Sequence, residues 1–347
     1  MKILLLSNFG ALFPAEYIYK YLVKAGHQVV SVGRIFKTDM PEFKHSIERL
    51  GSTHMPLFWR EETNRNGMPV WTVDLSTIFA MLGDDWDVIL ECECFNLHVS
   101  DDYDLIDKIF DIPYFLYKTQ YLEDYMPGHV THIFYAADLI KDKLLNTKSP
   151  MSDWNYEYHD NISREYTMTY LPLTVDPEIV VSKNKKANQY AFFAGNYPEG
   201  DFLPEFKDVY KMRGDVIDHL EMNLNGKFIC FKRRAFDYME YIRRASESLI
   251  MINAGIGGLN IRDFEAIALG KALITWDNPE YAKNHLVSGK DYIHYTTIQE
   301  ALIAAQHLLD HPEEAEIIGR NAKKIFDMYH HPENRIKVII EAIKNAK

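Results

Sequence analysis

A regular alternation of short apolar runs with amphipathic segments, along nearly the whole chain, constrains the fold most. In the first half the apolar runs lie at residues 2–7, 28–32, 87–92, 114–117 and 132–135. Apolar runs of this length, separated by helical or turn segments, are typical of parallel strands buried on both faces. The pattern therefore predicts an α/β protein built on doubly wound sheets.

A second alternating series follows a polar connector. Its apolar runs lie at residues 190–194, 227–231, 249–252, 272–275 and 292–294, with helical patterns over 205–220, 237–246, 261–269 and 298–309. At 347 residues the chain exceeds what one hydrophobic core usually supports. We therefore predict two Rossmann-like domains that face each other across a cleft. Their expected bounds are 1–173 for the N-terminal domain, 174–188 for the linker, 189–330 for the C-terminal domain, and 331–347 for a helix that can cross back to the first domain.

Charge and composition narrow the functional classes. The net charge of −12 argues against broad attachment to nucleic acid or anionic lipid, although it permits a local basic pocket. Cys92, Cys94 and Cys230 form no CxxC pair, which is typical of reduced thiols. No apolar stretch approaches the roughly 18 residues of a membrane span. We therefore expect a cytoplasmic protein without stable membrane insertion.

The segment from 250 to 275 carries the clearest functional chemistry. An apolar strand ends at Asn253, a turn with Gly257 and Gly258 follows, and Asn260 is a candidate N-cap for the next helix. Glycines let a ligand approach the backbone, and the free N–H groups of a helix N-terminus bind phosphate oxygens. The segment therefore fits a phosphate-bearing ligand.

Arg262 and Glu265 lie three residues apart and share one face of that helix. An arginine can neutralise a diphosphate with its fork of donors, while a carboxylate can accept two ribose hydroxyls. An ordinary surface salt bridge explains the same spacing equally well.

The same segment resembles the signature of a known family. Residues 258–270 read Gly-Leu-Asn-Ile-Arg-Asp-Phe-Glu-Ala-Ile-Ala-Leu-Gly, which is similar to the G-L-N-x-R-x-F-E-A-x-A-x-G motif of the CgeB-like branch of group-1 glycosyltransferases. Residues 171–177, 193–196, 311–314 and 331–335 also resemble this family. The resemblance is strong over about residues 170–345 and weak before them. It implies the GT-B fold, with a nucleotide-sugar donor bound mainly by the C-terminal domain and the acceptor on the side of the N-terminal domain.

The resemblance also implies roles for individual residues. Glu265 would hold the ribose of the donor, and Arg262 would face its diphosphate. A nucleoside-diphosphate sugar, with UDP slightly favoured, is the expected donor, and no further cofactor is expected. The other donor-side positions expected in the site are Asn260, Gly257, Gly258, Gly195 and Asn196.

Three further residues fit the site by their place in the predicted fold. Lys232 and Arg233 follow the strand that ends at Phe231, where cations could balance the diphosphate charge without a metal. A solvated basic loop is the alternative. Gly10, in the first loop of the N-terminal domain, would approach the donor or acceptor by fold position alone.

Glu91 and Glu93 are the candidates for a catalytic base. They stand at the end of the apolar run 87–92, and a carboxylate at a strand end could deprotonate an acceptor hydroxyl. Capping of the next helix is the alternative role. The aspartates at 101, 102 and 104 resemble a metal-binding motif but fit the start of a helix better, so no metal site is predicted.

The predicted function is therefore metal-independent transfer of a sugar from a nucleoside-diphosphate sugar to an acceptor, which could be a glycan, a protein or a small molecule. Three alternatives remain open. The chain could be a catalytically silent GT-B protein with a binding or coat-type role, or a sugar-nucleotide epimerase. It could also glucosylate modified DNA bases, which the net charge of −12 disfavours.

Overall fold

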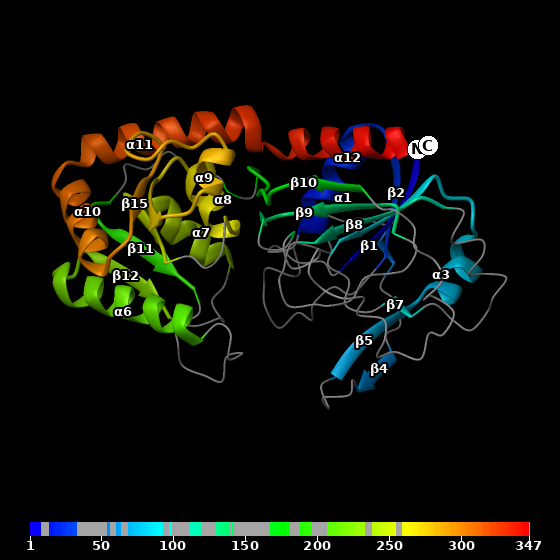
Figure 1. Ribbon diagram of the computed structural model, residues 1–347, viewed down its shortest axis with the longest axis horizontal. Coiled ribbons are helices and arrows are strands. Elements are labelled where there is room, and N and C mark those ends of the chain that lie inside the picture. Colours follow the sequence, from blue (N-terminus) through cyan, green and yellow to red (C-terminus); the bar gives the residue numbers. More distant parts are fainter. Residues whose placement is uncertain are drawn as a thin grey trace. The chain divides into compact units, whose positions relative to one another are not determined.

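The computed structural model describes residues 1–7, 14–32, 54–55, 60–63, 69–92, 97–98, 112–118, 130–138, 141, 167–178, 180, 188–195, 207–232, 238–254 and 259–346. The chain divides into two compact units, drawn in Figure 1: Met1–Pro172 together with Arg335–Lys347, and Leu173–Asn334. The described residues of the predicted linker thus group with the second unit, and the end of the chain groups with the first.

A parallel sheet of seven strands forms the core of the first unit. The strand order is β10-β9-β8-β6-β1-β2-β3. Leu4 of β1 lies between Val30 and Ile89 in register, and the apolar side chains of β1 are fully buried. The strands are β1 (Lys2–Ser7), β2 (Gln28–Val32), β3 (His54–Met55), β6 (Val88–Cys92), β8 (Tyr114–Lys118), β9 (His132–Tyr135) and β10 (Thr167–Tyr170).

Helices and a small sheet complete the described part of the first unit. Helix α1 (Pro14–Lys24) follows β1, and α3 (Leu75–Leu82) precedes β6. The small sheet has the order β4-β5-β7, with β4 (Arg60–Thr63), β5 (Pro69–Asp74) and β7 (Leu97–His98).

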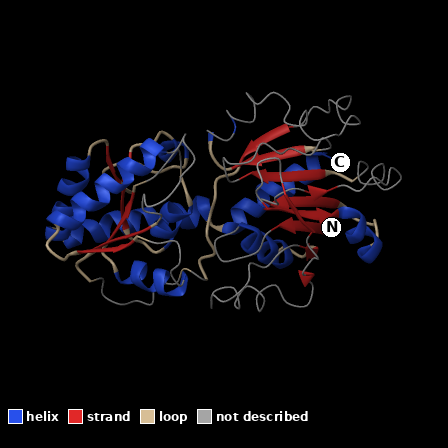
Figure 2. Ribbon diagram, turned by 90° about the horizontal axis from the view of Figure 1, so that it is seen from below, coloured by secondary structure: helices blue, strands red, loops and turns tan. Residues whose placement is uncertain are grey.

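A parallel sheet of five strands forms the core of the second unit, and Figure 2 shows helices around its strands. The strand order is β12-β11-β13-β14-β15. The strands are β11 (Ala191–Ala194), β12 (Phe228–Phe231), β13 (Ile250–Asn253), β14 (Ala272–Trp276) and β15 (Ile293–Tyr295). The helices are α6 (Lys207–Asn223), α7 (Tyr238–Glu247), α8 (Ile261–Ala268), α9 (Glu280–Lys283), α10 (Ile298–Asp310), α11 (Pro312–Ile325) and the π-helix η4 (Phe326–His330). Helix α12 (Pro332–Ala346) begins in this unit, and its residues from Arg335 on belong to the first unit.

The predicted α/β class is confirmed by these two parallel sheets. Every apolar run that the alternation identified is a strand, with bounds that shift by one residue at most. Strand β10 escaped prediction because Thr167–Tyr170 alternates polar and apolar residues at the edge of its sheet and is only partly buried. A continuous apolar run is typical of a strand buried on both faces, and the alternating sequence of β10 does not form one.

A close approach of two glycines fixes the end of helix α8 against helix α11. Gly270 ends the α8 region with a φ of +68°, a conformation that favours glycine. A Cβ atom on Gly319 of α11 would lie 2.1 Å from the Gly270 carbonyl oxygen. Only glycine at 319 therefore lets the two helices pack this closely, and this contact positions the helix that carries Arg262 and Glu265.

Candidate functional site

Helix α8 begins with a capping box, which fixes its N-terminus beyond the carboxyl end of β13. Asn260 is the N-cap, as the sequence predicts, and its Oδ1 accepts a hydrogen bond of 2.9 Å from the N–H of Arg262. In return, Asp263 Oδ2 accepts one of 2.9 Å from the N–H of Asn260. The sequence signal for this box is an Asn followed three residues later by an Asp.

Arg262 and Glu265 form an ion pair, with 2.9 Å between Nη1 and Oε2. The side chain of Glu265 is 0% exposed and that of Arg262 is 21% exposed. The guanidinium carbon lies 4.1 Å from the centre of the Tyr241 ring, close enough for a cation–π contact. Because the carboxylate is fully buried, this pair differs from the exposed i,i+3 salt bridge that the spacing alone also allowed.

Two tyrosines of α7 complete the surroundings of Glu265. The hydroxyl of Tyr238 donates to Oε1 over 2.8 Å, and that of Tyr241 donates to Oε2 over 2.5 Å. Burial raises the pKa of both tyrosines well above its ordinary value, and the nearby Glu265 adds to this effect, so both hydroxyls stay protonated donors. Neither tyrosine is among the site residues predicted from the sequence, and their i,i+3 spacing on a predicted helix is the signal that points to them.

Burial and neighbouring groups act in opposite directions on Arg262. Burial lowers the pKa of its guanidinium, but Tyr241 and Glu265 more than compensate and raise this pKa above its ordinary value. Arg262 therefore carries its positive charge near the N-terminus of α8, where the helix dipole also attracts anions.

A second buried network surrounds Asp263. Its Oδ1 accepts hydrogen bonds from Asn253 Nδ2 over 2.5 Å and from the Tyr281 hydroxyl over 2.9 Å. The Tyr281 hydroxyl also lies 2.7 Å from Thr275 Oγ1. Burial raises the pKa of Asp263 to about 6, although its hydrogen bonds with Asn260, Asn253 and Tyr281 act in the opposite direction. This network ties the ends of β13 and β14 to the first turn of α8.

The structure pairs the predicted cation Lys232 with carboxylates of α6. Its Nζ lies 2.6 Å from Glu221 Oε2 and 3.2 Å from Asp218 Oδ1, and the hydrogen bond to Glu221 is the main cause that raises the pKa of Lys232. Gly195 directly follows β11, and a Cβ atom there would lie 2.9 Å from the Phe193 ring. A contact of either residue with a donor stays a prediction.

Glu91, one of the two predicted bases, is buried in β6 of the first unit. It lies between Leu6 and Leu116 in register, and the Tyr114 hydroxyl donates a hydrogen bond to its Oε2. Its catalytic role stays a prediction. The other predicted site residues lie outside the described residues: Glu93, Gly10, Asn196, Arg233, Gly257 and Gly258.

In the part of the chain that the structure describes, no group of three or more His, Cys, Asp or Glu residues could hold a metal ion. No described helix combines the length and the apolar character needed to cross a membrane.

Comparisons with known proteins find similarity to glycosyltransferases. The model of a family described as glycosyl transferase-like matches residues 218–341, which include α7 and α8. No curated protein sequence matches the chain. A glycosyltransferase from Rickettsia africae is similar in structure, with a TM-score of 0.58, 13% identity, and 99% of this chain and 98% of that chain covered.

Two other solved structures resemble the chain over its whole length. HepE of Anabaena in complex with UDP-glucose has a TM-score of 0.60 and 11% identity, with 99% of this chain and 100% of that chain covered. The pneumococcal O-GlcNAc transferase GtfA in complex with UDP and GlcNAc has a TM-score of 0.58 and 8% identity, with 100% and 99% covered. At such identities these neighbours establish the fold alone.

Proposed function

The chain has the GT-B fold of group-1 glycosyltransferases and carries a glycosyl transferase-like region over residues 218–341, and from this we propose that it transfers a sugar from a nucleoside-diphosphate sugar. The observation that carries the proposal is the ion pair of Arg262 and Glu265 on the first turns of a capped helix within that region. The CgeB-like branch is the proposed subgroup within the family.

The donor is proposed to bind at the N-terminus of α8. Arg262 supplies a positive charge for the diphosphate, and the helix dipole adds to it. Glu265 supplies carboxylate oxygens for the ribose. UDP is the proposed nucleotide, supported by two structural neighbours that hold UDP-glucose or UDP. Lys232, Gly195 and Asn260, and Gly10, Asn196, Arg233, Gly257 and Gly258 outside the described residues, are the other proposed donor contacts.

The proposed reaction replaces the leaving diphosphate with an acceptor hydroxyl. The bond between the anomeric carbon and the phosphate oxygen breaks, and its electron pair leaves with the diphosphate, whose charge Arg262 and the helix N-terminus stabilise without a metal. The acceptor oxygen bonds to the anomeric carbon, and its proton passes to a base. Glu91 and Glu93 are the candidates for that base.

A thermal-shift panel of UDP, GDP, TDP, CDP and ADP tests donor binding. We expect one diphosphate, with UDP favoured, to raise the Tm, because a ligand at 100 times its Kd stabilises the folded state by about 2.7 kcal/mol. UDP- and GDP-sugars complete the panel. No shift with any of them at millimolar concentration would contradict the proposal and favour a catalytically silent protein.

Arg262→Ala, paired with Arg243→Ala, locates the binding site. Both arginines form i,i+3 ion pairs on adjacent helices, α8 and α7, but Arg243 lies outside the proposed site. We expect Arg262→Ala to abolish the nucleotide-induced shift and Arg243→Ala to keep it. Equal shifts in both variants would place the nucleotide elsewhere on the protein.

A further inference from the structure

A buried lysine ends one of the inner strands of the first unit. Lys118 is the last residue of β8, which lies between β6 and β9, and only 6% of it is exposed. Among the described residues, its ammonium makes no hydrogen bond or ion pair. Burial of an ammonium without a partner is unfavourable. Lys118 therefore suits a ligand better than it suits the stability of the fold.

The face of the sheet that carries Lys118 is polar at the carboxyl ends of its strands. Successive side chains of a strand point to opposite faces, so Tyr114 and Lys118 share one face. The Tyr114 hydroxyl donates to Glu91, which places this carboxylate of β6 on the same face. Tyr135 of β9 is in register with Lys118 and belongs to this face as well. Ligands of doubly wound sheets bind beyond the carboxyl ends of the strands, where Glu91, Lys118 and Tyr135 lie.

A second lysine adds positive charge beside Tyr135. Lys141 follows the end of β9, and its Nζ lies 5.8 Å from the centre of the Tyr135 ring. Both lysines are thus neighbours of one tyrosine, while the carboxylate of Glu91 is engaged by Tyr114. A lysine ammonium can only donate hydrogen bonds, so a matching ligand group must accept them. Carboxylates and phosphates do so most strongly, because they also carry the opposite charge.

We propose that Lys118 binds an anionic group of the acceptor, a phosphate or a carboxylate. The inference rests on the proposed function, in which Glu91 is a candidate base for the acceptor hydroxyl. It narrows the acceptor to a molecule that carries a negative charge. Lys118 holds that charge at the end of β8, on the face of the sheet that also carries Glu91 on the neighbouring strand.

A thermal-shift titration with inorganic phosphate at constant ionic strength tests the site. The nucleoside diphosphate that binds in the panel is present in excess, so that phosphate does not occupy the donor site. We expect phosphate to raise the Tm of the wild-type protein. Lys118→Met keeps an unbranched side chain but loses a hydrogen bond to a charged group, so we expect it to bind phosphate at least about tenfold more weakly. Equal affinities in the two proteins would overturn the proposal.

Acetate is the second probe and separates the two anionic groups. We expect Lys118→Met to weaken the binding of whichever probe stabilises the wild-type protein. Stronger binding of phosphate would assign a phosphate to the acceptor, and stronger binding of acetate a carboxylate. No rise in Tm with either probe would overturn the proposal.

Lys24→Met is the matched control. Lys24 is an exposed lysine of α1 that also lies near a tyrosine, with 5.3 Å between its Nζ and the centre of the Tyr21 ring. Helix α1 ends just before β2 begins, so Lys24 lies toward the amino ends of the strands. Both variants remove one positive charge from the same unit, and we expect Lys24→Met to bind phosphate as the wild-type protein does. An equal loss in Lys24→Met would show that net charge, and no site at Lys118, attracts the anion.

The stability of Lys118→Met without phosphate separates a binding role from a structural one. Methionine is apolar and needs no partner in a buried position, so we expect the Tm of Lys118→Met to equal or exceed that of the wild-type protein. A lower Tm together with lost phosphate binding would give Lys118 a structural role and contradict the proposal.

Failure of this inference and failure of the proposed function look different. If no nucleoside diphosphate binds, the proposed donor site is wrong, and the assignment of the anion to an acceptor falls with it. If a diphosphate binds but the affinity for phosphate and acetate does not depend on Lys118, the donor site stands and only the anionic acceptor is wrong.

Discussion

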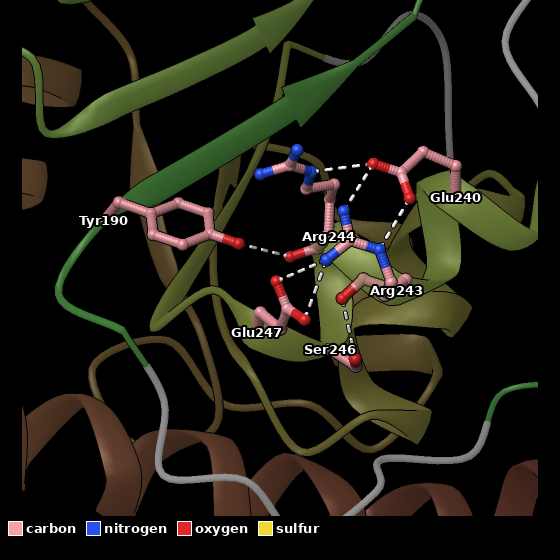
Figure 3. A network of polar contacts seen from close by, with 6 residues as sticks. All are labelled: Tyr190, Glu240, Arg243, Arg244, Ser246 and Glu247. Carbon is pink, nitrogen blue, oxygen red and sulfur yellow. Dashed lines mark hydrogen bonds and ion pairs between the residues drawn. The ribbon is translucent and has the colours of Figure 1, made fainter.

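Helix α7 takes part in two polar networks that use similar groups in opposite environments. On its exposed side, shown in Figure 3, Arg243 bridges Glu240 and Glu247 with contacts of 2.5 and 2.9 Å. On its buried side, Tyr238 and Tyr241 donate to Glu265 over similar distances. Water and salt screen the first network, whereas each lost partner in the second leaves a buried polar group without compensation. Two networks with similar bond lengths are therefore expected to contribute differently to the stability of the protein.

Removal of the central carboxylate from each network should give the largest difference in the free energy of unfolding between the two networks. Glu265→Ala removes the buried carboxylate that accepts hydrogen bonds from Tyr238, Tyr241 and Arg262, and we expect it to lower the free energy of unfolding by about 3–5 kcal/mol. Glu240→Ala removes only exposed ion pairs, and we expect a much smaller loss. Urea unfolding at neutral pH measures both. Comparable losses would mean that burial does not separate the two networks.

The contrast also shows which part of the site the sequence could reveal. Arg262 and Glu265 lie three residues apart on a helix that Asn260 caps, so their spacing predicts a shared face, and the structure pairs them. Tyr238 lies 27 residues from Glu265 in the sequence. The contact between them depends on how α7 and α8 pack, and no spacing along the chain records this.

Prediction of the fold succeeded where burial and sequence pattern coincide. Strands such as β13 lie inside a sheet covered on both faces, so they need continuous apolar runs, and their bounds could be read closely. The burial of Glu265 could not be read in this way, because a carboxylate three residues after an arginine looks the same on a surface helix. Its environment comes from neighbouring elements, as does that of Lys232, whose partners are on α6.

The pH dependence of stability should have opposite signs for a buried and an exposed carboxylate. Burial raises the pKa of Asp263 from 3.8 to about 6, so the folded state binds a proton before the unfolded state does. As the pH rises from about 4 to 6, the protein should therefore lose on the order of 2 kcal/mol of stability through this group. Hydrogen bonds from Arg243 and Arg244 lower the pKa of Glu240 to about 2, so its contribution is present above about pH 4.5 and lost as the pH falls toward 2.

Asp263→Asn separates these two effects, because the amide cannot titrate. Urea unfolding between pH 4 and 6 should show a smaller loss of stability with rising pH in Asp263→Asn than in the wild-type protein. Glu240→Gln is the control and should leave the slope over pH 4.5 to 6 close to that of the wild-type protein. An unchanged slope in Asp263→Asn would show that Asp263 titrates alike in the folded and unfolded states.

We expect the smallest effect on stability from Arg243→Ala, and the salt dependence of that effect tests whether it is electrostatic. Arg243→Ala removes contacts with Glu240 and Glu247 that are open to solvent, so we expect only a slight fall in Tm at low salt. At 1 M salt the screening length is about 3 Å, and the difference from the wild-type protein should nearly vanish. The effect of Glu265→Ala should persist there, because its cause is the loss of buried hydrogen bonds, which dissolved ions do not reach. A salt-resistant loss in Arg243→Ala would instead show that the long side chain stabilises α7 by packing, and the exposed network would then owe little to its charges.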